Sequence, residues 1–432
     1  MRRTTMGTGV AVAVLALLCL VPAPAHPTNG LNMIGFGAES VAMGGADLAV
    51  ARDTSAMNTN PAGIARIPGS ALDGYAAIAY PLSVAHRDQF GNDVEVSNRW
   101  AYLGGGGFTR RLGDGSWTGG IGFFAQGGAG NVYKNVATAF GTTDEMSSLF
   151  RIGKVTPSVA YRVDESLTLG VSLQVVYADI QQKLFPETSF FDPADPAHPF
   201  FGSEVKEMNG FGFGAKLGAL YKVNDRVTLG AVYTTKMNLA LDGGTVVANL
   251  SSVGLGKVTY RDARIDGMAL PEEVGVGVSV RPVQPLLVAV KVAWIDWSGA
   301  LETSTLHAAN PDNPGAPSTL ALPSTLNWRD QYVFAIGIAY DLTEKAIFRA
   351  GYNYGRNPIP AISLNPLLAA ITEHHATFGA GYAFSPKWQM SGAVEYAFNN
   401  AVTYDNPELP FGPGAEEENE SIAANVMLST RW

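Results

Sequence analysis

Cysteine is almost absent from this chain of 432 residues, and charged residues make up only 16% of it. The one cysteine, Cys19, lies in an N-terminal apolar stretch, so neither disulfides nor thiol chemistry is expected in the rest of the chain. The net charge of −9 argues against a nucleic-acid partner. After the N-terminus no run reaches 18 consecutive apolar residues, which excludes a protein that crosses a membrane with helices.

Catalytic and metal-binding patterns are also missing. The sequence contains no Gly-x-Ser-x-Gly, and no acidic or histidine cluster has the spacing of metal ligands. His374 and His375 are adjacent, so in a strand they would face opposite sides and could not share a metal. We therefore expect neither an enzyme nor a cofactor or metal.

The N-terminus has the pattern of an export signal. Arg2 and Arg3 precede a short apolar core, residues 10–21, and Ala23-Pro24-Ala25 fits a small-x-small cleavage site. The core is too short to span a bilayer, which takes about 20 residues. Bulky Leu18 before Cys19 disfavours the alternative of a lipoprotein. The sequence predicts a signal peptide over 1–25 and export from the cytoplasm.

Glycine and aromatic residues are abundant instead, with 49 glycines, 20 phenylalanines and 16 tyrosines, and apolar residues alternate with small or polar ones. Between 332 and 340 the even positions are large and apolar, and the odd positions are small or aliphatic. Such alternation predicts strands. Fourteen runs are expected to be strands: 70–86, 95–111, 115–127, 150–163, 166–183, 204–223, 225–240, 259–281, 285–299, 329–341, 344–356, 372–384, 386–400 and 418–432.

The connections alternate between short and long, and this distinguishes a membrane barrel from a soluble sandwich. Short periplasmic turns facing long extracellular loops are the usual asymmetry of outer-membrane barrels, whereas a sandwich has no reason to keep it. The expected long loops are 87–94, 128–149, 184–203, 241–258, 300–328, 357–371 and 401–417. We therefore predict an all-β fold, a transmembrane antiparallel β-barrel of about 14 strands over 70–432.

Residues 26–69 do not alternate and are rich in Gly, Ala, Asn and Met. A lumen of fourteen strands is too wide to be filled by wall side chains alone. We expect this segment to fold into the lumen as a hatch that plugs it. The alternative is a flexible periplasmic leader, which its moderate apolarity and low charge disfavour.

The segment that begins NGLNMIGFGAESVAMGG at Asn29 and continues to Asn60-Pro61-Ala62 resembles the hatch of the FadL/TodX family of outer-membrane transporters. FRAGYNYGRNPIP, from Phe348 to Pro360, supports the resemblance, as does the terminal Trp432, an aromatic end that barrel-assembly machinery reads. The resemblance implies a plugged barrel that captures a hydrophobic ligand on its outer loops. It also implies sideways release through a gap where the third strand kinks inward.

Three groups of residues are candidates for these steps. Glycines at the end of the third strand would permit the kink, although close packing against the hatch would need them equally. Phenylalanines in loop 184–203 would form a capture groove or, alternatively, pack loop on loop. Inward-facing cations would bind a carboxylate or pair with hatch acids such as Asp47. These residues are Gly127, Gly128 and Gly130; Phe185, Phe190, Phe191, Phe200 and Phe201; and Lys216, Lys236, Lys291 and Arg349.

The expected function is passive, ligand-gated uptake of long-chain fatty acids or similar hydrophobic molecules across the outer membrane of a Gram-negative cell. Outer-membrane lipid and lipopolysaccharide are the expected surroundings. Two alternatives stay open: a hydrocarbon or aromatic-compound channel of the same family, and a closed structural or adhesion barrel without transport. A general diffusion porin is disfavoured because the inner faces are small and glycine-rich rather than charged and open.

Overall fold

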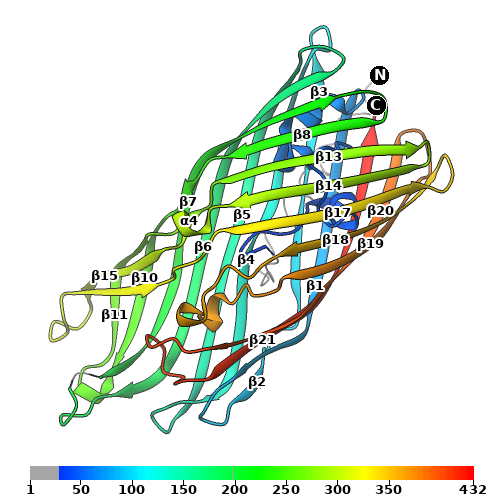
Figure 1. Ribbon diagram of the computed structural model, residues 1–432. Helices are drawn as coiled ribbons and strands as arrows, with labels where there is room; N and C mark the ends of the chain where they lie inside the picture. The colour runs from blue at the N-terminus through cyan, green and yellow to red at the C-terminus, as the bar shows by residue number, and fades with distance from the viewer. Residues whose placement is uncertain (1–28, 197) are drawn as a thin grey trace.

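The structure, a computed structural model, describes residues 29–196 and 198–432, so the expected signal peptide lies outside the described residues. A tall antiparallel barrel dominates the molecule (Figure 1). The wall consists of fourteen strands: β1 (Ser70–Arg87), β3 (Ala101–Leu112), β4 (Trp117–Ala137), β5 (Thr143–Arg162), β6 (Leu167–Phe190), β7 (Phe200–Lys222), β8 (Val227–Thr234), β13 (Glu273–Val283), β14 (Leu286–Ile295), β17 (Gln331–Asp341), β18 (Ala346–Gly355), β19 (His374–Ala383), β20 (Trp388–Tyr404) and β21 (Ala415–Arg431).

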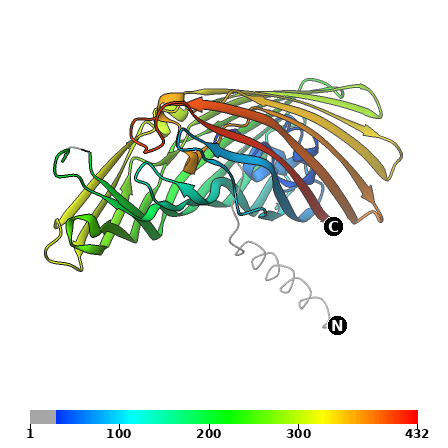
Figure 2. The same cartoon turned by 90° about the horizontal axis from the view of Figure 1, so that it is seen from below.

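The wall closes where its first strand meets its last. β1 pairs with β3 on one side and with β21 on the other, so neither terminal strand leaves a free edge. Ser70 and Trp432 exchange backbone hydrogen bonds of 2.8 and 3.0 Å at the seam. The expected barrel of fourteen antiparallel strands is therefore confirmed, and Figure 2 shows it from below.

Large apolar side chains point outward, as they do in a membrane barrel and not in a soluble sandwich. The even positions of β17 from Tyr332 to Tyr340 are 41–58% exposed, whereas Val333, Ala335 and Ala339 are at most 3% exposed. Outside a membrane such an apolar band would be costly, and in lipid it is the expected surface. No helix among the described residues is long and apolar enough to cross a membrane.

Six short turns lie at one end of the barrel, called the short-turn end below, and connect β3–β4, β5–β6, β7–β8, β13–β14, β17–β18 and β19–β20. The opposite, long-loop end differs from the prediction. The expected loops 241–258 and 300–328 contain further strands, β10 (Ala240–Leu250), β15 (Thr303–Pro311) and β16 (Thr319–Thr325). The run 259–281, expected to be one strand, is divided between β11 (Gly256–Asp266) and β13. Strands β10, β11, β15 and β16 extend the wall as one ladder from β7, because backbone pairing continues after the lipid-facing alternation ends.

Residues 29–69 contact the inner face of the wall. α2 (Gly37–Ala42) contacts β18 to β21, and the 3-10 helix η1 (Pro61–Arg66) contacts β4 to β7; α3 (Ala56–Thr59) lies between them in the chain. This N-terminal segment is drawn in blue inside the barrel in Figure 1. The remaining short elements are β2 (Asp93–Glu95), β9 (Met237–Asn238), β12 (Ala269–Leu270), α4 (Trp297–Ala300), η2 (Ser251–Val253), η3 (Ala361–Ser363) and η4 (Pro366–Leu368).

Candidate functional site

Asn60-Pro61-Ala62 fastens the N-terminal segment to the wall. The Asn60 side chain accepts from Ala62 N at 3.2 Å, capping η1, and donates to the carbonyls of Leu48 at 2.7 Å and Ala219 at 3.1 Å. The wall has glycine where the triplet approaches, because a Cβ on Gly218 would lie 2.2 Å from Asn60 Oδ1. One amide side chain thus joins two parts of the N-terminal segment to β7.

Gly127 and Gly128 mark a break in β4, the third wall strand. Their φ angles are +151° and +140°, and the register against β5 shifts between Ala125 and Gly127. The N-terminal segment contacts the strand here. Gly127 and Asn32 form an isolated antiparallel β-bridge, and Gly128 N donates to Leu31 O at 3.3 Å. A Cβ on Gly127 would lie 2.0 Å from that same carbonyl. The conformation and the close approach both require glycine.

The ladder between β3 and β4 ends just before this break. Its last pair is Gly105 with Phe124, and beyond it β3 pairs only with β1 while β4 pairs only with β5. Contact between the two chain segments resumes at Asn98, whose side chain donates to Gly130 O at 2.9 Å. Within the described residues, the wall therefore has a short stretch without backbone pairing beside the kink.

The five phenylalanines lie at the long-loop end, but they do not form one exposed loop. Phe190 and Phe200 end β6 and begin β7, so the connection is only 191–199. Phe140 stacks on Phe190 at 5.3 Å and on Phe200 at 4.6 Å; Phe191 and Phe201 are half-buried. The expectation is wrong for Phe185, which is 0% exposed and packs against Phe411. Its side chain belongs to the outer core, and Phe140, Phe190 and Phe200 form the accessible cluster.

Three of the four candidate cations face the lumen and meet the N-terminal segment. Arg349 Nη2 lies 2.6 Å from Glu39 Oε2, and Lys291 Nζ lies 3.9 Å from Asp47 Oδ1. Lys216 Nζ donates to the backbone carbonyl of Asn58 at 2.8 Å and lies 3.8 Å from Glu273, on β13. These contacts hold the segment to three different strands.

The inward placement of Lys236 was wrong. Alternation breaks between β8 and β9, and the Lys236 side chain is exposed and donates to the carbonyl of Gly299. His374 and His375 face opposite sides as expected: His374 is exposed, and His375 is buried 3.2 Å from Glu395. Among the described residues, no group of three or more His, Cys, Asp or Glu is placed to hold a metal ion.

Sequence reasoning missed a polar patch on the inner faces of β5, β6 and β7. Lys154 is 3% exposed and has no ion-pair or hydrogen-bond partner among the described residues. On the next strand Gln174 is 1% exposed, and neither of its amide atoms has a hydrogen-bond partner. Register places Gln174 diagonally between Lys154 and Lys216. The inward position of Lys154 could have been recognised from its neighbours Gly153 and Val155 in the alternating strand, because an outward lysine there would meet lipid.

A small cavity of about 80 Å³ lies between the N-terminal segment and the wall, and Asn58, Gln126 of β4, Lys216 of β7 and Glu273 of β13 line it. Asn58 donates to Gln126 at 3.0 Å, and Gln126 donates to Asn32 at 3.1 Å. The network connects the α3 region to the kinked strand. A polar chamber therefore lies directly behind the break in β4.

A histidine cluster lies at the long-loop end, beyond the Tyr80–Trp100 aromatic pair that marks the edge of the lipid-facing band. His86 Nδ1 is 2.8 Å from Glu417 and its Nε2 is 3.2 Å from Asp88. Burial alone would lower the pKa of His86, but the bonds to Asp88 and Glu417 outweigh it and raise the pKa to about 9. The imidazolium therefore ties the ends of β1 and β21 together at neutral pH.

The family model "Outer membrane protein transport protein (OMPP1/FadL/TodX)" matches residues 20–428. Outer membrane protein P1 of Haemophilus influenzae is 24% identical over 290 residues, 61% of this chain but only 58% of that relative's length.

Solved structures share the fold. The toluene transporter TodX of Pseudomonas putida superposes with a TM-score of 0.76 at 20% identity, over 94% of this chain and 100% of that one. A FadL homologue of Pseudomonas aeruginosa gives 0.69 at 16% identity, over 95% and 100%. Because the family model spans almost the whole sequence, this chain belongs to the OMPP1/FadL/TodX family of outer membrane transport proteins.

Proposed function

We propose that the barrel is a passive uptake route for hydrophobic molecules that carry a carboxylate, with long-chain fatty acids as the best-fitting class. The observation that carries this choice is the buried, unpaired Lys154 beside the unpartnered amide of Gln174. A buried cation without a partner is costly, and a ligand carboxylate would offset that cost while accepting from the amide. The short-turn end faces the periplasm in this proposal, and the long-loop end faces lipopolysaccharide.

Capture begins at the long-loop end. Phe140, Phe190 and Phe200 present stacked rings at the tips of β6 and β7. Burial of an acyl chain there would be driven by about 25 cal/mol per Å² of apolar surface removed from water. No energy source is needed, because the ligand moves down its own gradient.

The N-terminal segment acts as the hatch. Its ion pairs through Glu39 and Asp47 are separate, local contacts, and each can open without unfolding the wall. A ligand that enters the chamber behind Gly127 would compete with the contacts of Leu31 and Asn32 to the kinked strand. Hatch movement is thereby coupled to ligand entry.

Release is lateral, through the unpaired stretch between β3 and β4. The backbone groups of β3 and β4 are not paired with each other along this stretch, so opening the wall breaks no strand pairing there. Gly127, Gly128 and Gly130 provide the bend that turns β4 inward. The ligand then enters the outer membrane without crossing lipopolysaccharide.

A separate role is proposed for the C-terminal strand β21 with Trp432, which the barrel-assembly machinery would recognise.

Aromatic hydrocarbons are the second candidate. Lys291 and Arg349 already have acidic partners on the N-terminal segment, so they need no ligand charge. Proteins of the same fold include the toluene transporters TodX of Pseudomonas putida and TbuX of Ralstonia pickettii. If Lys154 does not contact the ligand, an uncharged molecule would fit the remaining surface.

Binding measurements on the detergent-purified barrel distinguish the candidates. Oleate and toluene are titrated against the unaltered protein, Lys154→Met, and the control Lys134→Met, whose lysine is exposed on β4. Loss of a charged hydrogen bond costs about 1.5–3 kcal/mol, so Lys154→Met should weaken oleate binding roughly 10- to 100-fold and leave toluene unchanged. Toluene binding without oleate binding would favour the hydrocarbon channel, and binding of neither would favour a closed structural barrel.

A further inference from the structure

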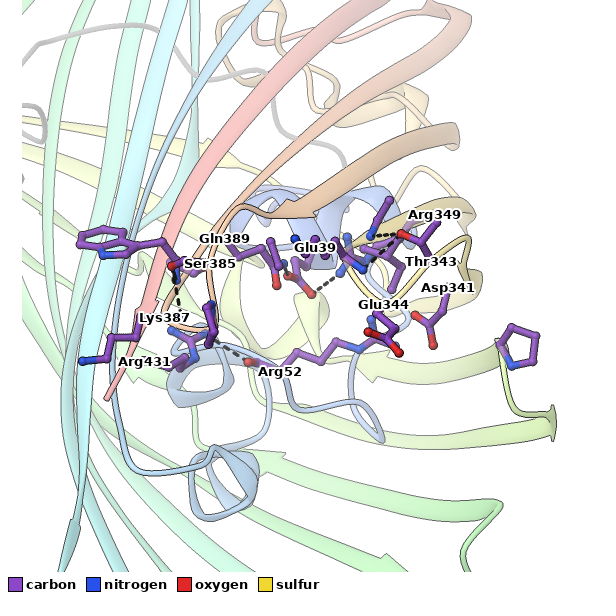
Figure 3. Close-up of a pocket in the computed structure, with 18 of the residues that line it drawn as sticks. Glu39, Arg52, Asp341, Thr343, Glu344, Arg349, Ser385, Lys387, Gln389 and Arg431 are labelled. Atoms are coloured by element: carbon purple, nitrogen blue, oxygen red, sulfur yellow. Dashed lines mark hydrogen bonds and ion pairs between the residues drawn. The ribbon is translucent and has the colours of Figure 1, made fainter.

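A second cavity lies at the short-turn end, away from the chamber behind the kink. It has a volume of about 560 Å³, within the range of small-molecule sites, and the β13–β14, β17–β18 and β19–β20 turns form its rim. Arg52 of the N-terminal segment and Arg349 of β18 also line it (Figure 3). The cavity therefore lies between the hatch and the periplasmic turns.

Positive charge exceeds negative charge on its lining. Five basic side chains line the cavity, Arg52, Lys345, Arg349, Lys387 and Arg431, against three acidic ones, Glu39, Asp341 and Glu344. Two of the basic groups have acid partners, because Arg349 pairs with Glu39 and Arg431 pairs with Asp73 at 2.6 Å.

The unpaired groups decide the character of the cavity. Asp341 pairs with Arg281 at 3.4 Å. Within the described part of the chain, the side chains of Arg52, Lys345 and Lys387 have no ion-pair partner within 4 Å. Among the three acidic residues of the lining, Glu344 alone likewise has no ion-pair partner in the described residues. Three free cations against one free carboxylate make the cavity attractive to an anion.

Arg349 supplies a second, independent indication. Its Nη2 bonds to Glu39, but Nε and Nη1 are buried without a hydrogen-bond partner. A guanidinium normally uses its donors, and two free N–H groups in a buried position suit an oxygen of a carboxylate or phosphate. Pro285, Ile347, Ala383 and Trp388 add apolar surface to the same lining.

We propose that this cavity is a second binding site, specific for a small anion that carries a carboxylate or phosphate group. Arg52, Lys345 and Lys387 would attract the anion, and the free N–H groups of Arg349 would bind its oxygens. The site is independent of which molecule the barrel transports, since it uses neither Lys154 nor the kink.

An anion bound in this cavity would also affect the contact between the hatch and the wall. Glu39 already engages Arg349, and it accepts from Gln389 at 2.5 Å. An anion on Arg349 would compete with Glu39 and weaken the contact of α2 with the wall. An anion from the periplasm could thereby loosen the hatch from the side opposite to ligand entry.

Calorimetric titration tests the site with three probes: hexanoate, neutral hexan-1-ol and inorganic phosphate. All proteins carry Lys154→Met, so that the buried lysine on which the proposed transport function rests makes no charged contact. Lys345→Glu/Lys387→Glu reverses two exposed charges at the rim, and Arg52→Gln removes the deeper one. Lys134→Gln, at an exposed position on β4, is the matched control.

We expect at least one of the two anions to bind and hexan-1-ol not to bind, with the anion affinity at least 10-fold lower in the double reversal and unchanged in Lys134→Gln. Hexanoate binding alone identifies an amphipathic carboxylate as the ligand class, and phosphate binding identifies a general oxyanion site. Absence of anion binding, or equal affinity in the rim reversal and its parent, overturns the proposal. Because Lys154 is absent throughout, this failure is separate from failure of the proposed transport function.

Discussion

The contact between Arg349 and Glu39 should control how often the first part of the N-terminal segment, which contains α2, leaves the wall. Both side chains are buried, at 2% and 8% exposure, and their closest atoms are 2.6 Å apart. Removing one partner of such a pair typically costs about 3–5 kcal/mol, because the other charge stays buried and unpaired. Arg349→Met should therefore raise the open population of α2 by at least roughly 100-fold, since about 1.4 kcal/mol corresponds to tenfold.

Hydrogen exchange followed by mass spectrometry measures this opening. The reporters are the amides of Met43, Gly44 and Gly45, which bond to carbonyls of Ser40 and Val41 at 2.9–3.1 Å. Exchange at these amides should accelerate in Arg349→Met, while wall amides keep their rates.

The double variant Glu39→Gln/Arg349→Met provides the critical control. Because it removes both charges, much of the protection should return, and the difference measures the coupling between the two residues. Equal exchange in Arg349→Met and the unaltered barrel, or no recovery in the double variant, would refute the idea that this ion pair holds α2.

Three further perturbations follow from the structure. Gly127→Val should reduce uptake at least tenfold while the barrel still assembles, because a Cβ at this position would clash with Leu31 O. Normal uptake by a variant that is shown to be folded would mean that the kink is not part of the transport route. Phe190→Ser should weaken capture and raise the ligand concentration for half-maximal uptake without changing the maximal rate. His86 has a raised folded-state pKa, so the stability it contributes is fully present below its ordinary pKa of 6.5 and is lost as pH rises through about 9. Proteolysis of the long-loop end should accelerate as the pH rises from 6.5 to about 9, and His86→Gln should remove this pH dependence.

Sequence alternation was sufficient to predict the number and order of the wall strands. A residue that faces lipid must be apolar, so each spanning strand carries its orientation in its own side chains, and even Arg349 was correctly expected to face inward. Past the lipid band this constraint ends. β10, β15 and β16 lie past that band in segments that were expected to be loops, and the expected strand 259–281 is divided between β11 and β13.

The candidate site was only partly predictable, because it depends on contacts between distant segments. Gly127 and Gly128 were expected to bend β4, but nothing local indicates that Leu31 and Asn32 meet them. Lys236 was misplaced because alternation was extended through the break after β8. The pairing of Arg349 with Glu39 spans 310 positions, and only the folded barrel brings these residues together.

Uptake by Gram-negative cells that lack their own fatty-acid and hydrocarbon channels tests the central claim most directly. Radiolabelled oleate and toluene are supplied to cells that express the unaltered barrel, Lys154→Met or Lys134→Met at matched outer-membrane levels. We predict that the unaltered barrel admits oleate down its gradient, that Lys154→Met lowers oleate uptake at least tenfold, and that Lys134→Met does not. Oleate uptake no greater than in cells without the barrel, or uptake indifferent to Lys154, would contradict the proposed transport of hydrophobic carboxylates.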